Sequence, residues 1–132
     1  MATEKNAALA GKKILLAEDD PVMQQLFRIL LTRKGADAVV AGDGRTAVEL
    51  YAEGDFAAVL LDIQMPVMGG IEAAEAIREI EREKGRRVPL VAVTADAMAE
   101  DEEALRARGF DDCVSKPLDF ERFFATLERH LA

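Results

Sequence analysis

The chain is short of several residue types, and each shortage narrows what the protein can be. Among its 132 residues there is one cysteine, Cys113, one tyrosine, one histidine and no tryptophan. A single cysteine cannot form an internal disulfide, so a reducing cytoplasm is the expected compartment. No apolar run approaches the ~18–20 residues that a membrane-spanning helix needs. We therefore expect neither a disulfide-stabilised secreted domain nor a protein that crosses or binds a membrane.

Basic residues are also in the minority, with 17 lysines and arginines against 25 acidic residues and a net charge of −8. Proteins that bind nucleic acid usually present a basic surface, so this balance argues against direct nucleic-acid binding. Hydrophobic residues make up 50% of the chain, and 132 residues allow one domain with its own core. Residues 1–12 lack the apolar segment of a signal peptide and are expected to be a flexible tail, which leaves 13–132 as the domain.

Strand-like and helix-like segments alternate along the whole chain. Apolar runs of strand length occur at 13–17, 36–41, 56–61 and 89–93 and around 113–114. Segments with helical periodicity or helix-capping signals follow them at 21–34, 44–54, 70–84, 97–108 and 119–132. Five strand–helix units in succession predict one doubly wound parallel sheet with helices on both faces. The segment 97–108 has few apolar residues, which fits either a loosely attached helix that can shift or a well-solvated surface helix.

The apolar run 56–61 is the centre of this pattern. It predicts a strand that is buried on both faces and that ends at a carboxylate, Asp62. Parallel sheets keep their chemistry at the carboxyl ends of their strands. The same edge is expected to collect residues that follow the other strands: Glu18, Asp19, Thr94 and Lys116. Each residue alone has an ordinary explanation as a helix cap, a strand residue or a surface charge. Together, crowded carboxylates are costly unless a cation joins them.

The residue types at this edge suit phosphoryl chemistry. Oxygen ligands favour a hard cation, and a site with two or three carboxylates suits Mg²⁺, which keeps several waters. A metal ion, an ammonium group and a hydroxyl around one carboxylate would neutralise a transferring phosphoryl group from several sides. Asp62 follows the central strand and is the predicted nucleophile, with an aspartyl phosphate as its product.

Four segments carry a resemblance to a known family. They are Ile14-Leu-Leu-Ala-Glu-Asp-Asp-Pro21, Leu60-Leu-Asp-Ile-Gln-Met-Pro-Val-Met-Gly-Gly70, Ala92-Val-Thr-Ala-Asp-Ala-Met98 and Ser115-Lys-Pro-Leu118. From Lys13 to Leu131 the chain resembles the receiver domain of two-component response regulators, and its details are most similar to receivers of hybrid histidine kinases. The resemblance implies a flavodoxin-like fold, a single five-stranded sheet with strand order 2-1-3-4-5 and five helices.

The resemblance also implies a role for each acidic residue at the edge. Asp62 would accept a phosphoryl group from a phosphohistidine. Asp19 would bind Mg²⁺ directly, and Glu18 would do so mainly through water. Gln64 would offer its backbone carbonyl to the same ion.

The resemblance gives the remaining residues roles around the phosphoryl group. Thr94 would turn its hydroxyl toward the phosphate, and Lys116 would contact it through an ammonium group that precedes a cis Lys116–Pro117 bond. Gln64 and Asp96 would flank the hydrolytic water and tune the lifetime of the phosphoryl group. The chain departs from the family at Cys113, where the family usually has a tyrosine or phenylalanine whose ring moves inward on phosphorylation. That cysteine fits either an inert small hydrophobe or a redox role. His130 is expected to be a surface residue.

The predicted function is a phosphoacceptor switch that would catalyse its own phosphorylation and slow dephosphorylation but would not be an enzyme of multiple turnover. Its donor would be a histidine kinase or a histidine phosphotransfer protein. A downstream protein target would bind the surface of the fourth helix, fifth strand and fifth helix, through which homodimerisation is a further expectation. The alternatives are a metal-dependent phosphatase, in which Gln64 stands where a second acid is usual, a flavodoxin-like binding module and an unphosphorylated scaffold.

Overall fold

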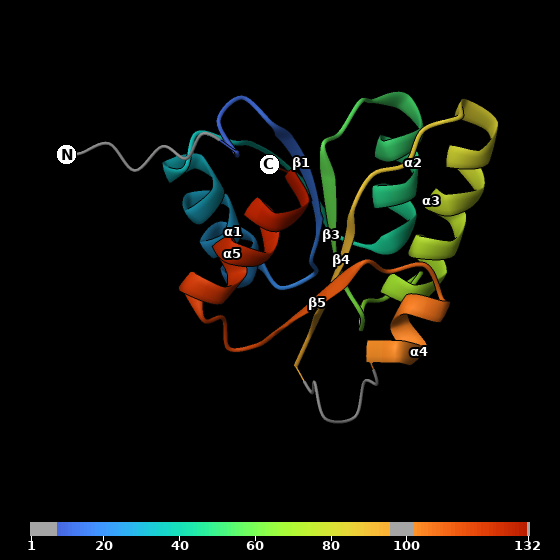
Figure 1. Cartoon of the computed structure of the whole chain (residues 1–132). Helices are drawn as coiled ribbons and strands as arrows, with labels where there is room; N and C mark the ends of the chain where they lie inside the picture. Colours follow the sequence, from blue (N-terminus) through green and yellow to red (C-terminus); the bar gives the residue numbers. More distant parts are fainter. Residues whose placement is uncertain (1–7, 96–101, 132) are drawn as a thin grey trace.

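The computed structural model describes residues 8–95 and 102–131, which form an α/β sandwich (Figure 1). Its strands are β1 (Lys13–Ala17), β2 (Asp37–Ala41), β3 (Ala58–Asp62), β4 (Leu90–Thr94) and β5 (Asp112–Ser115). Its helices are α1 (Pro21–Arg33), α2 (Gly44–Glu53), α3 (Gly70–Lys84), α4 (Glu102–Ala107) and α5 (Phe120–Leu131). The strands form one parallel sheet in the order β2-β1-β3-β4-β5, which confirms the predicted fold.

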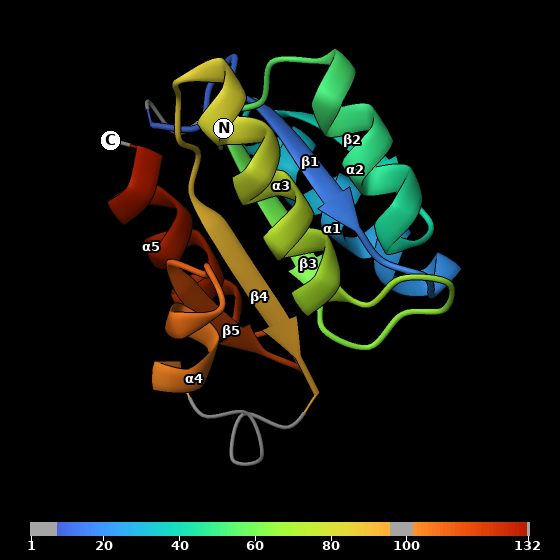
Figure 2. The same ribbon diagram turned by 90° about the vertical axis from the view of Figure 1, so that its right-hand side faces the viewer.

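Different helices cover the two faces of the sheet (Figures 1 and 2). On one face α1 and α5 pack together, with the rings of Phe27 and Phe123 5.5 Å apart. On the other face α2 and α3 lie side by side, and Leu105 of α4 joins their core. Every residue of β3 and β4 is buried. This burial is the reason why these strands appear in the sequence as unbroken apolar runs rather than as alternating patterns.

The N-terminal tail is shorter than predicted, because part of residues 1–12 packs in the domain. Leu9, which was expected in the flexible tail, is fully buried in the core between α1 and α5. The Gly11 amide also donates a hydrogen bond to the Gly35 carbonyl at 2.9 Å. The domain therefore includes residues 8–12, and the rest of the expected tail, residues 1–7, lies outside the described residues.

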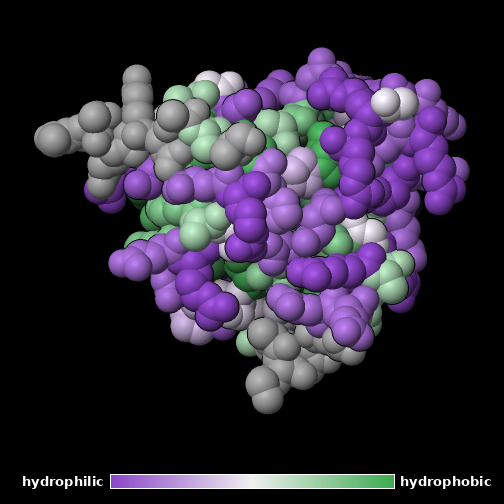
Figure 3. All heavy atoms as spheres, viewed as in Figure 1, coloured by the Kyte–Doolittle hydropathy of each residue, from purple (hydrophilic) through white to green (hydrophobic). Residues whose placement is uncertain are grey.

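The fourth helix is shorter than expected in the part that the structure describes. It covers Glu102–Ala107, while positions 97–101 of the expected helix lie outside the described residues. Leu105 is its one buried residue, and just beyond its end Arg108 pairs with Glu75 of α3 at 2.9 Å. In the same view as Figure 1, polar and charged residues cover most of the surface around α4, β5 and α5 (Figure 3). No helix in the described ranges is long and apolar enough to span a bilayer.

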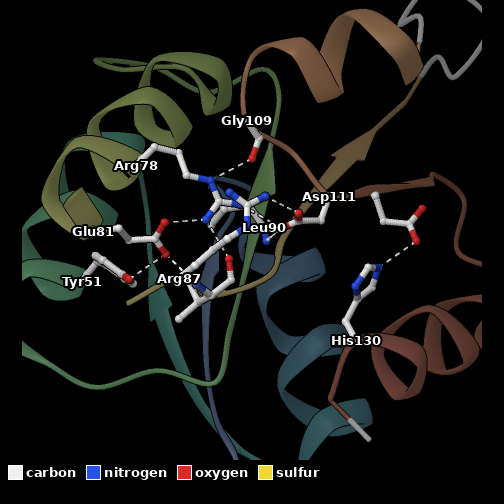
Figure 4. Close-up of polar contacts among 10 residues, drawn as sticks. Tyr51, Arg78, Glu81, Arg87, Leu90, Gly109, Asp111 and His130 are labelled. Carbon is white, nitrogen blue, oxygen red and sulfur yellow. Dashed lines mark hydrogen bonds and ion pairs between the residues drawn. The ribbon is translucent and has the colours of Figure 1, made fainter. Parts of the chain in front are cut away.

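A buried ionic network lies at the amino-terminal end of the central strands (Figure 4). Glu81 of α3 is 5% exposed, and its carboxylate accepts hydrogen bonds from three groups. The Tyr51 hydroxyl donates at 3.1 Å, the Arg78 guanidinium at 2.6 Å and the Val88 amide at 2.6 Å. Burial, followed by the negative charge of Glu81, raises the pKa of Tyr51 to about 12. This network was not predicted from the sequence.

Arg78 connects that carboxylate to the segment that enters β5. Its guanidinium donates to the carbonyls of Gly109 at 3.0 Å and Val88 at 2.8 Å, and to the Asp111 carboxylate at 2.8 Å. Burial alone would raise the pKa of Asp111. The Leu90 amide, a hydrogen bond from Arg87 and the charge of Arg78 outweigh it and lower this pKa. We call the five side chains of Tyr51, Arg78, Glu81, Arg87 and Asp111 the basal network.

Candidate functional site

The topology brings the ends of four strands to one edge of the sheet. Ala17 pairs with Leu61, Asp62 with Val93 and Thr94 with Ser115. The residues that end or follow these strands are therefore neighbours, and the arrowheads of β1 and β4 in Figure 2 point to this edge. The Lys116 amide donates to the Thr94 carbonyl at 2.8 Å, which fixes the start of the lysine side chain beside β4. We call Glu18, Asp19, Asp62, Thr94 and Lys116 the acidic rim.

Three carboxylates of the acidic rim converge. Glu18, Asp19 and Asp62 each contribute an oxygen atom, and these atoms lie within 4.8 Å of one another. Glu18 is 1% exposed and Asp62 is 6% exposed, whereas Asp19 is open to solvent. The exposed carboxylate gives a ligand access to the two buried ones.

Lys116 lies between the two buried carboxylates. Its Nζ atom is 3.0 Å from Asp62 Oδ2 and 2.9 Å from Glu18 Oε1. Burial alone would lower the pKa of Lys116, but its close contacts with the carboxylates of Glu18 and Asp62 outweigh that effect and raise it. Burial raises the pKa of Glu18, although contacts with Lys116 and the Asp20 amide oppose the shift. The two acids therefore favour the positive charge of the lysine, and burial makes the charge of Glu18 costly.

The hydrogen bonds of Glu18 are incomplete. Its Oε2 atom accepts from the Asp20 amide at 3.1 Å. Its Oε1 atom is fully buried, forms an ion pair with Lys116 Nζ at 2.9 Å and accepts no further hydrogen bond from the described residues. A buried carboxylate with an incomplete set of hydrogen bonds is costly and marks a place for a cation or water. The all-oxygen donor set fits a hard divalent cation held by Glu18, Asp19 and Asp62.

Backbone contacts fix the orientation of these acids. Asp62 Oδ1 accepts a hydrogen bond from the Gln64 backbone amide at 3.1 Å. Gln64, which was predicted as a metal ligand, is therefore hydrogen-bonded to the predicted nucleophile. Gln24 of α1 donates from Nε2 to the Glu18 carbonyl at 2.6 Å. Gln24 was not predicted from the sequence as part of the site. Its only signal was its position one turn after Asp20, which caps α1 by accepting from the Val22 amide.

Other predicted residues lie away from the rim or outside the described part. Cys113 is half-buried on β5 and lines a groove of about 520 Å³ between α4, β5 and α5. His130 is not a plain surface residue, because its Nε2 atom lies 3.0 Å from Asp112 Oδ2 (Figure 4). The cis peptide bond between Lys116 and Pro117 is confirmed. Asp96 lies outside the described residues.

The sequence was compared with known families and proteins. The profile of the response regulator receiver domain matches residues 14–128. Hybrid signal transduction histidine kinase I of Dictyostelium discoideum is 43% identical over 113 residues, which are 82% of this chain but 6% of that protein. The polar-differentiation response regulator DivK of Brucella ovis is 33% identical over 120 residues, which are 91% of this chain and 96% of that protein. The chain thus spans a small part of one relative and nearly all of another.

Solved structures show the same similarity. The receiver domain of a Pseudomonas aeruginosa sensor histidine kinase, solved with magnesium in its active-site cleft, is 35% identical. It superposes with a TM-score of 0.83 over 92% of this chain and 98% of that one. The co-crystal structure of the Saccharomyces cerevisiae phosphotransfer protein Ypd1 and the Ssk1 receiver matches at 27% identity and a TM-score of 0.85, over 93% of this chain and 90% of that one. The profile match, these relatives and the observed fold agree: the chain belongs to the response regulator receiver domain family of two-component signalling.

Proposed function

We propose that this receiver domain is a phosphoacceptor switch in which Asp62 takes a phosphoryl group from a phosphohistidine in a Mg²⁺-dependent reaction. The observation that carries the proposal is the position of Lys116, whose ammonium group lies between the buried carboxylates of Glu18 and Asp62. Such a site holds a nucleophile, a positive charge beside it and a buried acid with an incomplete set of hydrogen bonds. These groups match what transfer of a phosphoryl group requires.

The roles of the acids follow from their exposure and contacts. Asp19 is exposed and would contact the ion directly, and Glu18 would hold it with its buried carboxylate or through water. Asp62 and the Gln64 carbonyl would complete the protein ligands. When bound, Mg²⁺ supplies positive charge that neutralises the oxygens of the phosphoryl group.

The transfer step uses the chain's own groups. A carboxylate oxygen of Asp62 attacks phosphorus, the bond between phosphorus and the donor imidazole nitrogen breaks, and that nitrogen keeps the electron pair. Lys116 already donates to Asp62 Oδ2 and would move its ammonium group to an oxygen of the arriving phosphoryl group. Thr94 would present its hydroxyl to another of these oxygens. The same groups would support slow hydrolysis of the aspartyl phosphate.

Phosphorylation would change the surface through charge. It replaces the single negative charge of the Asp62 carboxylate with a phosphoryl group that carries about −1.5 to −2 charges next to Lys116, which would be drawn from Glu18 toward the phosphate. Lys116 follows β5 directly, and its amide is bonded to Thr94 at the end of β4, so its movement would bias the arrangement of α4, β5 and α5. A downstream protein or a second copy would bind that surface. Cys113 lies within it on β5, so an aromatic side chain at this position is not part of the switch.

The comparisons support the choice of donor. One similar protein is a hybrid histidine kinase, and one similar structure contains a histidine phosphotransfer protein. We therefore propose a phosphorylated histidine of a kinase or a phosphotransfer protein as the donor. The family assignment favours this function over the phosphatase and flavin-binding alternatives, and the scaffold alternative is decided by the phosphorylation experiment.

The experiment is phosphotransfer from a phosphorylated histidine phosphotransfer protein, and mass spectrometry of the intact protein measures the phosphoryl groups gained. We expect the wild-type chain to gain one phosphoryl group with Mg²⁺ and none with excess chelator. Asp62→Asn should gain none. Asp20→Asn is the matched control, because Asp20 is also an acid next to the rim but serves as a helix cap, a role that asparagine fills equally well. Equal labelling of Asp62→Asn and wild type would contradict the proposal.

A further inference from the structure

We infer that Gly44 of α2 is a positioning residue for the Asp62 site, because its close contact with Met68 fixes the loop that carries Gln64. The inference rests on the proposed function of Asp62 and adds a residue that lies on a different element. The loop is the connection from β3 to α3, residues 63–69. Its geometry decides where the Gln64 carbonyl lies.

The loop contains a strained turn. The Met68 amide donates to the Pro66 carbonyl at 2.7 Å, two residues earlier, and the residue between them, Val67, has a φ of 67°. This is a γ-turn with a β-branched residue in the left-handed region, which is unfavourable for such side chains. Val67 is also 73% exposed, so packing of its own side chain does not stabilise the turn. Contacts from neighbouring elements must hold the loop in this shape.

Gly44 provides such a contact. Its amide donates to the Met68 carbonyl at 3.1 Å. A Cβ atom on Gly44 would lie 2.2 Å from the Met68 carbonyl oxygen and 2.9 Å from its carbonyl carbon. These are backbone atoms and cannot rotate away, so any side chain at this position must displace the loop or the start of α2. The start of α2 is itself fixed by Asp43, whose carboxylate accepts from the Thr46 amide at 2.8 Å.

The loop passes this constraint to the acidic rim over a few residues. At its beginning, the Gln64 amide donates to the Asp62 carboxylate at 3.1 Å. At its end, the Gly70 amide donates to the Ile63 carbonyl at 3.1 Å. The hydrogen bond between Gly70 and Ile63 therefore closes the loop, and Gly44 holds the loop at Met68. A shift of the Met68 carbonyl will displace the γ-turn and, with it, the Gln64 carbonyl beside Asp62.

Two other glycines supply matched controls. Gly42 lies two residues before Gly44 in the same connection, but a Cβ atom there would meet only Gln24 Nε2 at 4.0 Å. Gly54 lies at the opposite end of α2, where a Cβ atom would lie 2.9 Å from the Phe56 ring. Gly42→Ala therefore tests an added methyl group beside the rim without a clash. Gly54→Ala tests a clash at α2 without contact to the loop.

The experiment compares Gly44→Ala, Gly42→Ala and Gly54→Ala in the full chain. Mg²⁺ affinity is measured by calorimetric titration, phosphorylation by acetyl phosphate at saturating Mg²⁺, and stability by urea unfolding. We expect Gly44→Ala to weaken Mg²⁺ binding by about 10-fold or more and to slow phosphorylation, as loss of a supporting contact does at other metal sites. Gly42→Ala should stay within roughly twofold of wild type. Gly54→Ala should lose stability but keep wild-type Mg²⁺ affinity.

Wild-type Mg²⁺ affinity in folded Gly44→Ala would overturn this inference and leave the role of Asp62 intact. Failure of the wild-type chain itself to be phosphorylated would instead overturn the proposed function. If Gly44→Ala does not fold, amide hydrogen exchange of the wild-type protein decides. We expect saturating Mg²⁺ to slow exchange of the Gly44 amide and to leave the Gly42 amide unchanged. No change at Gly44 would overturn the inference.

Discussion

The two ends of the sheet both bury carboxylates next to a cation, but they satisfy them differently. In the basal network Glu81 accepts hydrogen bonds from Tyr51, Arg78 and a backbone amide. In the acidic rim Glu18 is buried even more completely, yet one of its oxygens meets only the ammonium of Lys116 and accepts no further hydrogen bond from the described residues. Breaking a complete set of partners around a buried carboxylate is destabilising, whereas a buried carboxylate with an incomplete set already costs free energy. Burial alone therefore does not distinguish a functional acid from a structural one, but the completeness of its hydrogen bonds does.

The two cations differ in the same way. The guanidinium of Arg78 is planar and spreads its donors over two carboxylates and two carbonyls, so it is fixed in one place. The ammonium of Lys116 is a point charge on a flexible chain, shared between two acids. It can leave one acid for a phosphoryl group without loss of a directed set of bonds. Arginine therefore suits the structural end of the sheet and lysine the reactive end.

The largest loss of stability is expected for Arg78→Met. Removal of the guanidinium leaves the buried carboxylate of Glu81 without its cation, which costs about 3–5 kcal/mol in comparable cases, whereas the half-buried Asp111 keeps Arg87. Urea unfolding measures this loss. Arg82→Met is the control, because Arg82 pairs with Glu79 on the same helix but both are exposed, and such pairs contribute about 0–1 kcal/mol. Equal stability of the two variants would show that the basal network is not structural.

A second experiment replaces one buried acid with its amide at each end of the sheet, Glu81 in the basal network and Glu18 in the acidic rim. Glu81→Gln should lower stability by about 1.5–3 kcal/mol, because it weakens hydrogen bonds to a charged group. Glu18→Gln should leave stability unchanged or raise it without Mg²⁺, because burial raises the pKa of the Glu18 carboxyl and makes its charge costly in the fold. Mg²⁺ titrations should show the opposite: Glu18→Gln should weaken Mg²⁺ binding, and Glu81→Gln should keep the wild-type affinity. Similar losses of stability in both variants would contradict the distinction between the two ends.

How far the sequence predicts these features depends on the distance over which each is determined. The sheet order and the acidic rim could be predicted, because strand ends in a parallel sheet meet wherever each strand lies in the chain. The burial of Leu9 could not, since its neighbours in sequence resemble a tail and the core cluster that it joins is built from α1, α5 and the sheet. Arg78 looked like a solvated charge on an amphipathic helix, because Gly109 and Asp111 are more than thirty positions away. The contact of Gly44 with Met68 was hidden for the same reason.

The smallest effect concerns Tyr51, the one tyrosine of the chain. Its pKa is raised from 10.0 to about 12, so the stabilisation from the neutral phenol is fully present below pH 10 and is lost as the pH rises toward 12. Ultraviolet absorbance of the folded protein should follow this single titration, and Tyr51→Phe should remove it. Tyr51→Phe should also cost about 0.5–1.5 kcal/mol, the loss of one hydrogen bond. Ionisation near pH 10 in the folded state would contradict the closed basal network.

The position of the phosphoryl group decides whether Asp62 is the acceptor. The chain is incubated with a phosphorylated histidine phosphotransfer protein, with and without Mg²⁺, and is then treated with borohydride, which reduces an aspartyl phosphate to homoserine. Peptide mass spectrometry locates the product. We predict homoserine at position 62, in the Mg²⁺ sample alone, with Asp19 and Asp20 unchanged. Homoserine at Asp19 or at any acid outside the rim, with Asp62 unmodified, would contradict the assignment of Asp62 as the acceptor.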